Sequence, residues 1–147
     1  MSLKLLIVLA LGCAAAVPAA AQNRPNEARE TMRRMGMKLM SPKKLAKAIA
    51  RAEKSPLGSK ANPVRVNMPE GQIAYLRRLR CADGRAPAFV RQGNVGPGVY
   101  RTIVDRYTVT CPDAAPVDAY MDMYHDGPED RPLPGFTMAP PEAGTEI

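Results

Sequence analysis

The chain has 147 residues, of which 21 are Lys or Arg and 14 are Asp or Glu, giving a formal net charge of +7 at pH 7. This length suits one small domain with a modest core and excludes two domains of ordinary size. The charge is uneven: residues 22–60 contain eleven basic and three acidic residues, whereas residues 112–147 contain one basic and eight acidic residues. The two ends therefore either meet in the fold or face different partners.

Residues 1–21 have the pattern of a secretory signal peptide. Lys4 gives a positive start, residues 5–11 form a short apolar run, and residues 19–21 supply the small side chains that a signal peptidase recognises. A membrane anchor is disfavoured because it needs about 20 continuous apolar residues. A lipoprotein signal ending at Cys13 is a third alternative. We therefore expect an exported protein, periplasmic or secreted, that is cleaved after this segment.

Signal cleavage removes Cys13 and leaves two cysteines, Cys81 and Cys111, in an oxidising compartment. We predict a disulfide between them, for which the chain-entropy model gives a stabilisation of about 3–4 kcal/mol. The alternative is a pair of free thiols that act as a nucleophile or as metal ligands, which an oxidising compartment disfavours.

Residues 22–60 predict an arm of two basic amphipathic helices. Apolar residues recur at helical spacing between residues 26 and 40. Ser41 and Pro42 then supply an N-cap and a proline at the first position of a second helix, which ends before Pro56. Because both apolar stripes are narrow and rich in Ala and Met, we expect the arm to dock weakly on the domain.

The cations of this arm are candidates for contact with an anionic membrane surface, where each Lys or Arg contributes roughly 1 kcal/mol. The alternative is a solvated pair of helices. Nucleic acid is not expected as a partner, because export makes it improbable and the chain has no recognised nucleic-acid motif or aromatic stacking platform. The candidate residues are Arg29, Arg33, Arg34, Lys38, Lys43, Lys44 and Lys47.

A compact α+β domain is predicted at residues 61–126, after a linker at residues 57–63 that contains Gly, Asn and Pro. Residues 64–68 alternate apolar and polar side chains, as in a short strand. Residues 69–80 fit a helix, which we favour, although a strand also fits their pattern.

The second half of this domain is expected to be mainly β-structure. A short strand is predicted at residues 88–90. The glycines of residues 93–98 predict a turn, since the Gly-Lys-Ser/Thr ending of a phosphate-binding loop is absent. The clearest element is a β-hairpin with strands at residues 100–111 and 117–125. If Cys111 lies opposite Val117, Tyr107 faces Met121 and Arg106 faces Asp122.

The second hairpin strand places acids and phenols on one face, by the two-residue period of a strand. This face is a candidate site for a basic partner or a cation. The alternative is a solvated face whose charge is met by Arg106 and by the basic helices. We predict no metal site, because the chain lacks the loop with which calcium sites wrap their ion. The residues of this Asp–Tyr face are Asp118, Tyr120, Asp122, Tyr124 and Asp126.

His125 is the only histidine, and the predicted register places Asp105 on the same face of the adjacent strand. Such a pair is the beginning of a general base, so a small periplasmic hydrolase-like enzyme is the main alternative function. A nucleophile is not evident, because no serine lies in a Gly-x-Ser-x-Gly setting. Zinc is also disfavoured, since its sites gather three or four protein ligands.

Residues 127–147 are acidic and rich in proline, and they predict a disordered or extended tail. The chain as a whole predicts an α+β fold: a small disulfide-linked domain with a β-hairpin or short antiparallel sheet, preceded by two basic helices. We expect a non-enzymatic exported binding or cell-envelope module without a cofactor. Its expected partner is an envelope protein or an anionic membrane surface.

Overall fold

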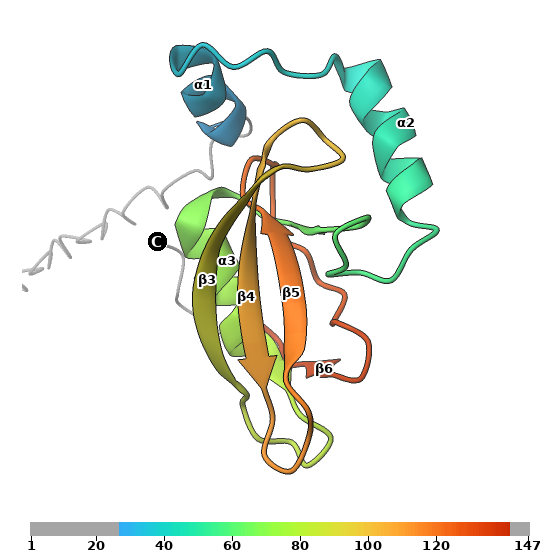
Figure 1. Ribbon diagram of the computed structural model, residues 1–147, viewed down its shortest axis with the longest axis vertical. Coiled ribbons are helices and arrows are strands. Elements are labelled where there is room, and N and C mark those ends of the chain that lie inside the picture. Colours follow the sequence, from blue (N-terminus) through green and yellow to red (C-terminus); the bar gives the residue numbers. More distant parts are fainter. Residues whose placement is uncertain (1–26, 142–147) are drawn as a thin grey trace, which may run out of the picture.

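The computed structural model describes residues 27–141, so the predicted signal peptide and the last six residues lie outside the described part. Within that part, three helices accompany a four-stranded and a two-stranded sheet, as the predicted α+β class requires (Figure 1). The elements are α1 (Glu27–Arg34), α2 (Pro42–Ala52), β1 (Val64–Arg65), α3 (Met68–Arg78), β2 (Leu79–Arg80), β3 (Ala88–Pro97), β4 (Ile103–Thr110), β5 (Val117–Asp122) and β6 (Thr137–Met138).

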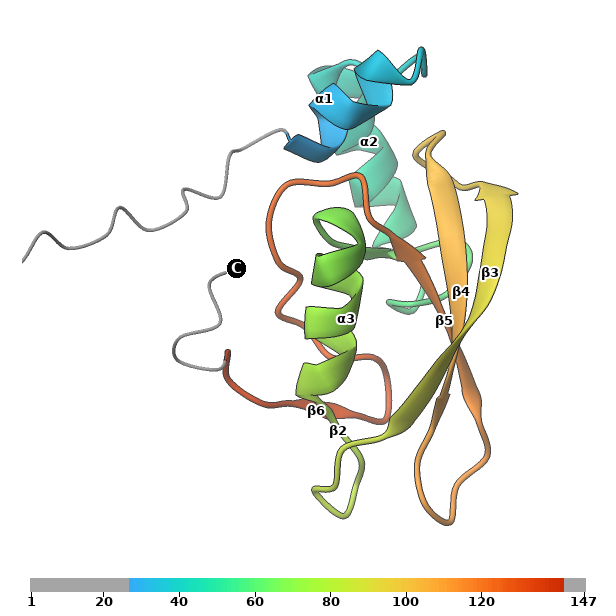
Figure 2. The same cartoon turned by 90° about the vertical axis from the view of Figure 1, so that its left-hand side faces the viewer.

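The main sheet has the strand order β1-β5-β4-β3, with β1 parallel to β5 and the other pairs antiparallel. α3 covers one face of this sheet, and no helix of the described residues covers the other face (Figure 2). The core lies between α3 and the sheet. Its buried side chains are Val64, Val66, Tyr75, Leu76, Leu79, Tyr107, Val109, Ala119, Met121 and Leu133.

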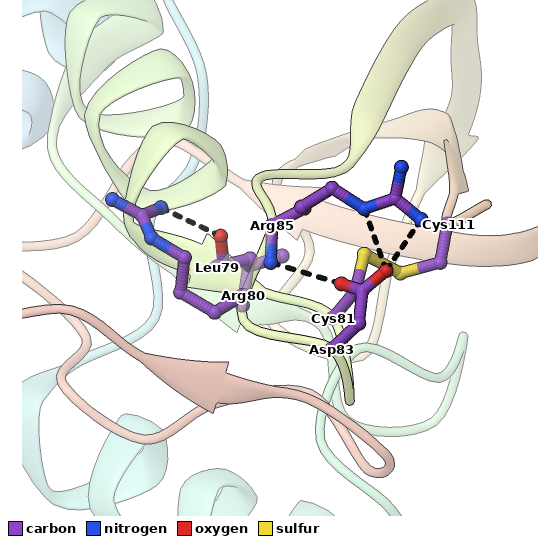
Figure 3. Close-up of a disulfide and its surroundings, with 6 residues drawn as sticks. All are labelled: Leu79, Arg80, Cys81, Asp83, Arg85 and Cys111. Carbon is purple, nitrogen blue, oxygen red and sulfur yellow. Dashed lines mark hydrogen bonds and ion pairs between the residues drawn. A yellow bond between two sulfur atoms is a disulfide. The ribbon is translucent and has the colours of Figure 1, made fainter.

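α3 confirms the helix that the sequence favours over a strand. A proline lies in its first turn together with Glu70, and Arg77 and Arg78 lie in its last turn, as the helix dipole prefers. Where the helix ends, the Arg80 guanidinium donates to the carbonyl oxygen of Leu79 at 2.8 Å (Figure 3). It also donates to the carbonyl oxygen of Arg77 at 2.7 Å. These bonds satisfy carbonyl groups that a helix terminus leaves without partners.

The predicted hairpin is present as β4 and β5, but its predicted register is wrong by two residues. Val117 lies opposite Val109, and Tyr107 lies opposite Ala119. The error arises because Cys111 leaves the strand, which lengthens the turn between the two strands. Since the shift is an even number of residues, the side chains of residues 117–122 still lie on their predicted faces.

The disulfide between Cys81 and Cys111 is confirmed, with the two Cα atoms 5.8 Å apart. It joins the turn after β2 to the turn between β4 and β5 (Figure 3). An ion pair between Arg85 and Asp83, 2.7 Å long, closes the first of these turns. The bond thereby ties the segment after α3 to the end of the sheet where β4 turns into β5.

Most of the glycine-rich segment at residues 93–98 belongs to the strand β3 instead of forming the predicted turn. β3 runs through it to Pro97, with irregular register between Arg91 and Gly93 and again after Asn94. Gly93 has a φ of +124°, which residues with a side chain rarely adopt, so the glycine permits the bulge. β3 is the edge strand of the sheet, where such irregularities are common.

The described part of the predicted tail, residues 127–141, lies against the domain. Leu133 is 2% exposed and belongs to the core, and the Tyr75 hydroxyl donates to the carbonyl oxygen of Arg131 at 3.0 Å. β6 pairs with β2. Of the predicted alternatives, a disordered or an extended tail, the first does not hold for these residues. Leu133 and the backbone pairing of β6 attach a segment whose composition gives no periodic signal.

α1 is docked more firmly than the sequence predicts. Ala28 and Met32 are fully buried against Tyr124, in a small second core beyond the end of the sheet. The helix ends at Arg34 rather than near residue 40, so Met35 is 56% exposed.

The residues 57–63, predicted as a linker, form an ordered turn, in which the Gly58 N–H donates to the carbonyl oxygen of Asn62 at 2.8 Å.

Candidate functional site

The five residues of the predicted Asp–Tyr face do not share one surface. β5 ends at Asp122, so strand alternation does not continue to Tyr124 and Asp126 as predicted. Asp122 is completely buried and Tyr124 is 8% exposed, because the chain bends after β5 and pairs with the segment before α3. Asp118 and Asp126 are exposed and Tyr120 is half-buried. The structure thus divides the predicted face between the interior and the outside.

The outer part of this face carries its own countercharge. Asp118 lies 3.5 Å from a guanidinium nitrogen of Arg106 and accepts a hydrogen bond from the Thr108 hydroxyl at 3.4 Å. Arg106 lies opposite Tyr120 in the sheet, and not opposite Asp122 as the predicted register had it. The surface formed by Asp118 and Tyr120 is therefore small and locally neutralised.

His125 lies beside Asp122 and not beside the predicted Asp105. The His125 ring is nearly buried, its Nε2 atom is 3.4 Å from Asp122 Oδ2, and its edge contacts the Tyr100 ring at a centroid distance of 4.9 Å. Asp122 also accepts hydrogen bonds from the Thr102 hydroxyl and from the backbone N–H of Tyr124. These contacts join β5 to the loop between β3 and β4.

Asp105 has different partners. Arg91 donates to both of its carboxylate oxygens, at 2.8 and 3.2 Å, and Gln72 donates to Oδ2 at 3.2 Å. Gln72 in turn accepts a hydrogen bond from the Tyr107 hydroxyl at 3.0 Å. Asp105 therefore connects α3 to the sheet, and the general-base pair expected from the sequence is not assembled.

The seven candidate cations of the basic arm fall into two groups. Arg29 donates to the carbonyl oxygen of Met40 at 3.0 Å, and Arg33 and Arg34 lie 3.5 and 3.6 Å from Glu30. The other four are exposed and form no ion pair with any of residues 27–141. These four are Lys38, Lys43, Lys44 and Lys47.

α2 carries three of these lysines on its outward face. Lys43 and Lys47 are one helical turn apart, and Lys44 lies beside them; all are exposed. The opposite side of the helix carries Leu45 and Ile49, which line a hollow of about 410 Å³. The other residues around this hollow are Arg65, His125, Asp126, Pro128, Glu129 and Arg131.

An ion-pair network holds the C-terminal end of α2 to the domain. Glu53 lies 3.1 Å from Arg65 and 3.4 Å from Arg131, and both arginines also contact Glu129, at 3.6 and 2.8 Å. Arg65 additionally donates to the Tyr100 hydroxyl at 3.1 Å. Sequence reasoning missed this network because its members come from three distant segments with no local spacing. The only signal was the excess of acidic residues near the end of a basic chain.

The network makes a pH-dependent contribution to stability. Burial raises the pKa of the Glu129 carboxyl, but the hydrogen bonds and charge of Arg131, with the charge of Arg65, outweigh it and hold the pKa below the ordinary 4.5. Folding therefore favours the carboxylate form of Glu129. The stabilisation that follows is fully present above about pH 4.5 and is lost as the pH falls through the lowered pKa.

We expect the stability difference between the wild type and Glu129→Gln to shrink on acidification. Urea unfolding from pH 7 to pH 3 measures it; a constant difference would contradict the expectation.

Comparisons with models of known protein families, with curated proteins and with solved structures found no match to this chain. Among residues 27–141, no helix is long and apolar enough to cross a membrane. In the same range, no three His, Cys, Asp or Glu side chains are arranged to hold a metal ion.

Proposed function

We propose that this chain is an exported, non-enzymatic binding module of the cell envelope that associates with anionic membrane surfaces through the outward face of α2. The observation that carries the proposal is the set of three exposed lysines, Lys43, Lys44 and Lys47, on one helix face with no acidic partner in residues 27–141. The predicted signal peptide and the disulfide support export, because disulfides persist in oxidising compartments.

The position of α2 also supports this choice of surface. The helix lies at the periphery of the molecule, to one side of the sheet and away from α3 (Figure 1). Its attachment to the domain uses the opposite side and the C-terminal end, so the lysine face is left uncovered. By contrast, Asp122 of the Asp–Tyr face is buried and Asp118 is paired with Arg106, which leaves α2 as the stronger candidate.

The expected strength of the association follows from the number of charges. Near an anionic membrane each lysine contributes about 1 kcal/mol, so loss of two lysines should weaken binding about 30-fold at low salt. Because exposed charges are screened within about 8 Å at physiological ionic strength, the same association should decrease strongly as salt is added.

We therefore expect Lys43→Gln/Lys47→Gln to reduce binding to vesicles that contain phosphatidylglycerol about 30-fold at low salt. The matched control is Arg77→Gln/Arg85→Gln, which removes the same charge where α3 ends and in the turn after β2, at the other end of the molecule (Figure 2). Co-sedimentation of the exported chain measures both. Equal losses in the two variants would show that net charge alone matters, and no binding by the wild type at low salt would refute the proposal.

A separate measurement tests export. Mass spectrometry of the chain recovered from the periplasm or medium should show an N-terminus at Gln22, as cleavage at the end of the predicted signal peptide requires. A full-length chain that remains in the cytoplasm would contradict this part of the proposal.

A further inference from the structure

The apolar side of α2 is incompletely buried, in contrast to that of α1. In α1, Ala28 and Met32 are completely buried. In α2, Leu45, Ala48 and Ile49 are only half-buried, and the two larger side chains face the hollow of about 410 Å³ instead of a packed core. The hollow is open to solvent, since Pro128 and Arg131 in its lining are exposed, so the apolar side chains of α2 stay partly hydrated and gain little from their present position.

The attachment of α2 is concentrated at its C-terminal end. Ala52 is its only buried residue, and the adjacent Glu53 makes the ion pairs with Arg65 and Arg131. The side chains of Glu53 and Arg131 are 42% and 52% exposed, so solvent and dissolved salt reach this contact. Exposed ion pairs are weak, and they are weakened further by competing ions.

The residues on either side of α2 give it room to move. Before the helix, residues 35–41 contain no helix or strand. Met37 and Leu39 pack against the second core and Arg29 donates to the Met40 carbonyl oxygen, so the backbone freedom nearest α2 lies around Ser41. After it, a turn at residues 53–55 leads into the ordered turn that Gly58 and Asn62 close. A rotation of the helix that leaves both cores intact therefore has to use backbone angles at residues 40–41 and 53–55.

We propose that α2 leaves its position over the hollow at an anionic phospholipid bilayer and inserts Leu45, Ala48 and Ile49 between the headgroups. This inference rests on the proposed function, since the lysine face supplies the charge complementarity that brings α2 to the surface. Lipid phosphates compete with Glu53 for Arg131 and so weaken the attachment. With its apolar side in the bilayer, the helix lies in the interface plane, and its lysines extend along the headgroups.

A tryptophan reporter tests insertion directly, because the chain contains no Trp. We expect Trp fluorescence of Leu45→Trp to be quenched by anionic vesicles whose acyl chains carry bromine. The control variant is Ala50→Trp, at an exposed position of α2, and its fluorescence should not be quenched. If the chain co-sediments with the vesicles but neither reporter is quenched, insertion is refuted and surface binding stands. If the wild type does not co-sediment at low salt, the proposed function itself fails.

Release of the attachment is tested by a second pair of variants. Glu53→Gln removes the ion pairs that hold α2, and we expect it to increase the fraction of protein that stays on anionic vesicles at high salt. Glu70→Gln is the matched control, because it makes the same change of net charge at an exposed residue of α3. An equal increase in both variants, or no increase in either, would show that the Glu53 contacts do not restrain α2.

Discussion

Replacement of both Cys81 and Cys111 by serine is expected to lower the free energy of unfolding by about 3–4 kcal/mol. The disulfide joins residues 30 positions apart and closes a loop in the unfolded chain. Without it the unfolded chain regains conformational entropy, which stabilises the unfolded state relative to the folded one. For a small domain with a total stability of about 5–15 kcal/mol, the loss is a large fraction of the whole. Cys81 is 3% exposed, so the serine hydroxyl at this position also loses contact with water.

Urea unfolding of the oxidised wild type and of the double variant measures this loss. The reduced wild type is the control, and its stability should lie slightly above that of the variant, since both lack the same constraint but only the variant buries a serine hydroxyl at position 81. An oxidised wild type no more stable than its reduced form would show that the disulfide only connects positions that the fold already holds together. Vesicle binding by the folded variant should be unchanged, because α2 contains no part of the disulfide.

The second large effect is expected for Leu133→Ala, which should cost about 2–5 kcal/mol of stability. Leu133 is 2% exposed and packs in the core beneath α3, although it comes from the proline-rich segment after β5. Removing its side chain leaves a cavity that the surrounding core fills only in part, and this adds to the lost transfer free energy. Thermal or urea unfolding of the variant measures the cost.

A double-mutant cycle locates this effect structurally. Gly58 has a φ of +82°, and a Cβ atom at this position would overlap the Leu133 side chain. We expect Gly58→Ala to be destabilising, and we expect the double variant with Leu133→Ala to lose less than the sum of the two single losses. A Leu133→Ala cost below about 1 kcal/mol, or strictly additive losses, would contradict the placement of Leu133 against Gly58.

The sequence predicted the elements that local patterns determine. The periodicity of residues 69–80, with Pro69 and Glu70 at their start, predicted α3, and the two cysteines predicted their disulfide. Alternation along residues 100–111 and 117–125 predicted the two hairpin strands, which the structure forms at residues 103–110 and 117–122. These features depend on near neighbours or on the small number of cysteines, so no knowledge of the remaining fold was needed.

The errors arise where distant segments decide the outcome. Asp122 and Tyr124 continue the alternation of acids and phenols in the sequence. The backbone of Tyr124, however, pairs with Asn67, the residue before α3, and β5 ends at Asp122. Leu133 is isolated among prolines and acids, so it gave no signal that its segment packs in the core. The ion-pair network around Glu53 brings together residues from three parts of the chain. That network determines which side of α2 faces the domain, and therefore which side presents the exposed lysines.

The strand order has a consequence for the assembly of the chain. β5 is the last of the four main strands in the sequence, yet it lies between β1 and β4, and β1 has no other partner in that sheet. During synthesis from the amino end, α3 and the β3–β4 pair can form early. Val64 can pair only after Met121 has been synthesised. Pairing between such distant residues slows folding, because the loop must close before the contacts are gained. The order in which this protein is synthesised is therefore not the order in which its sheet is completed.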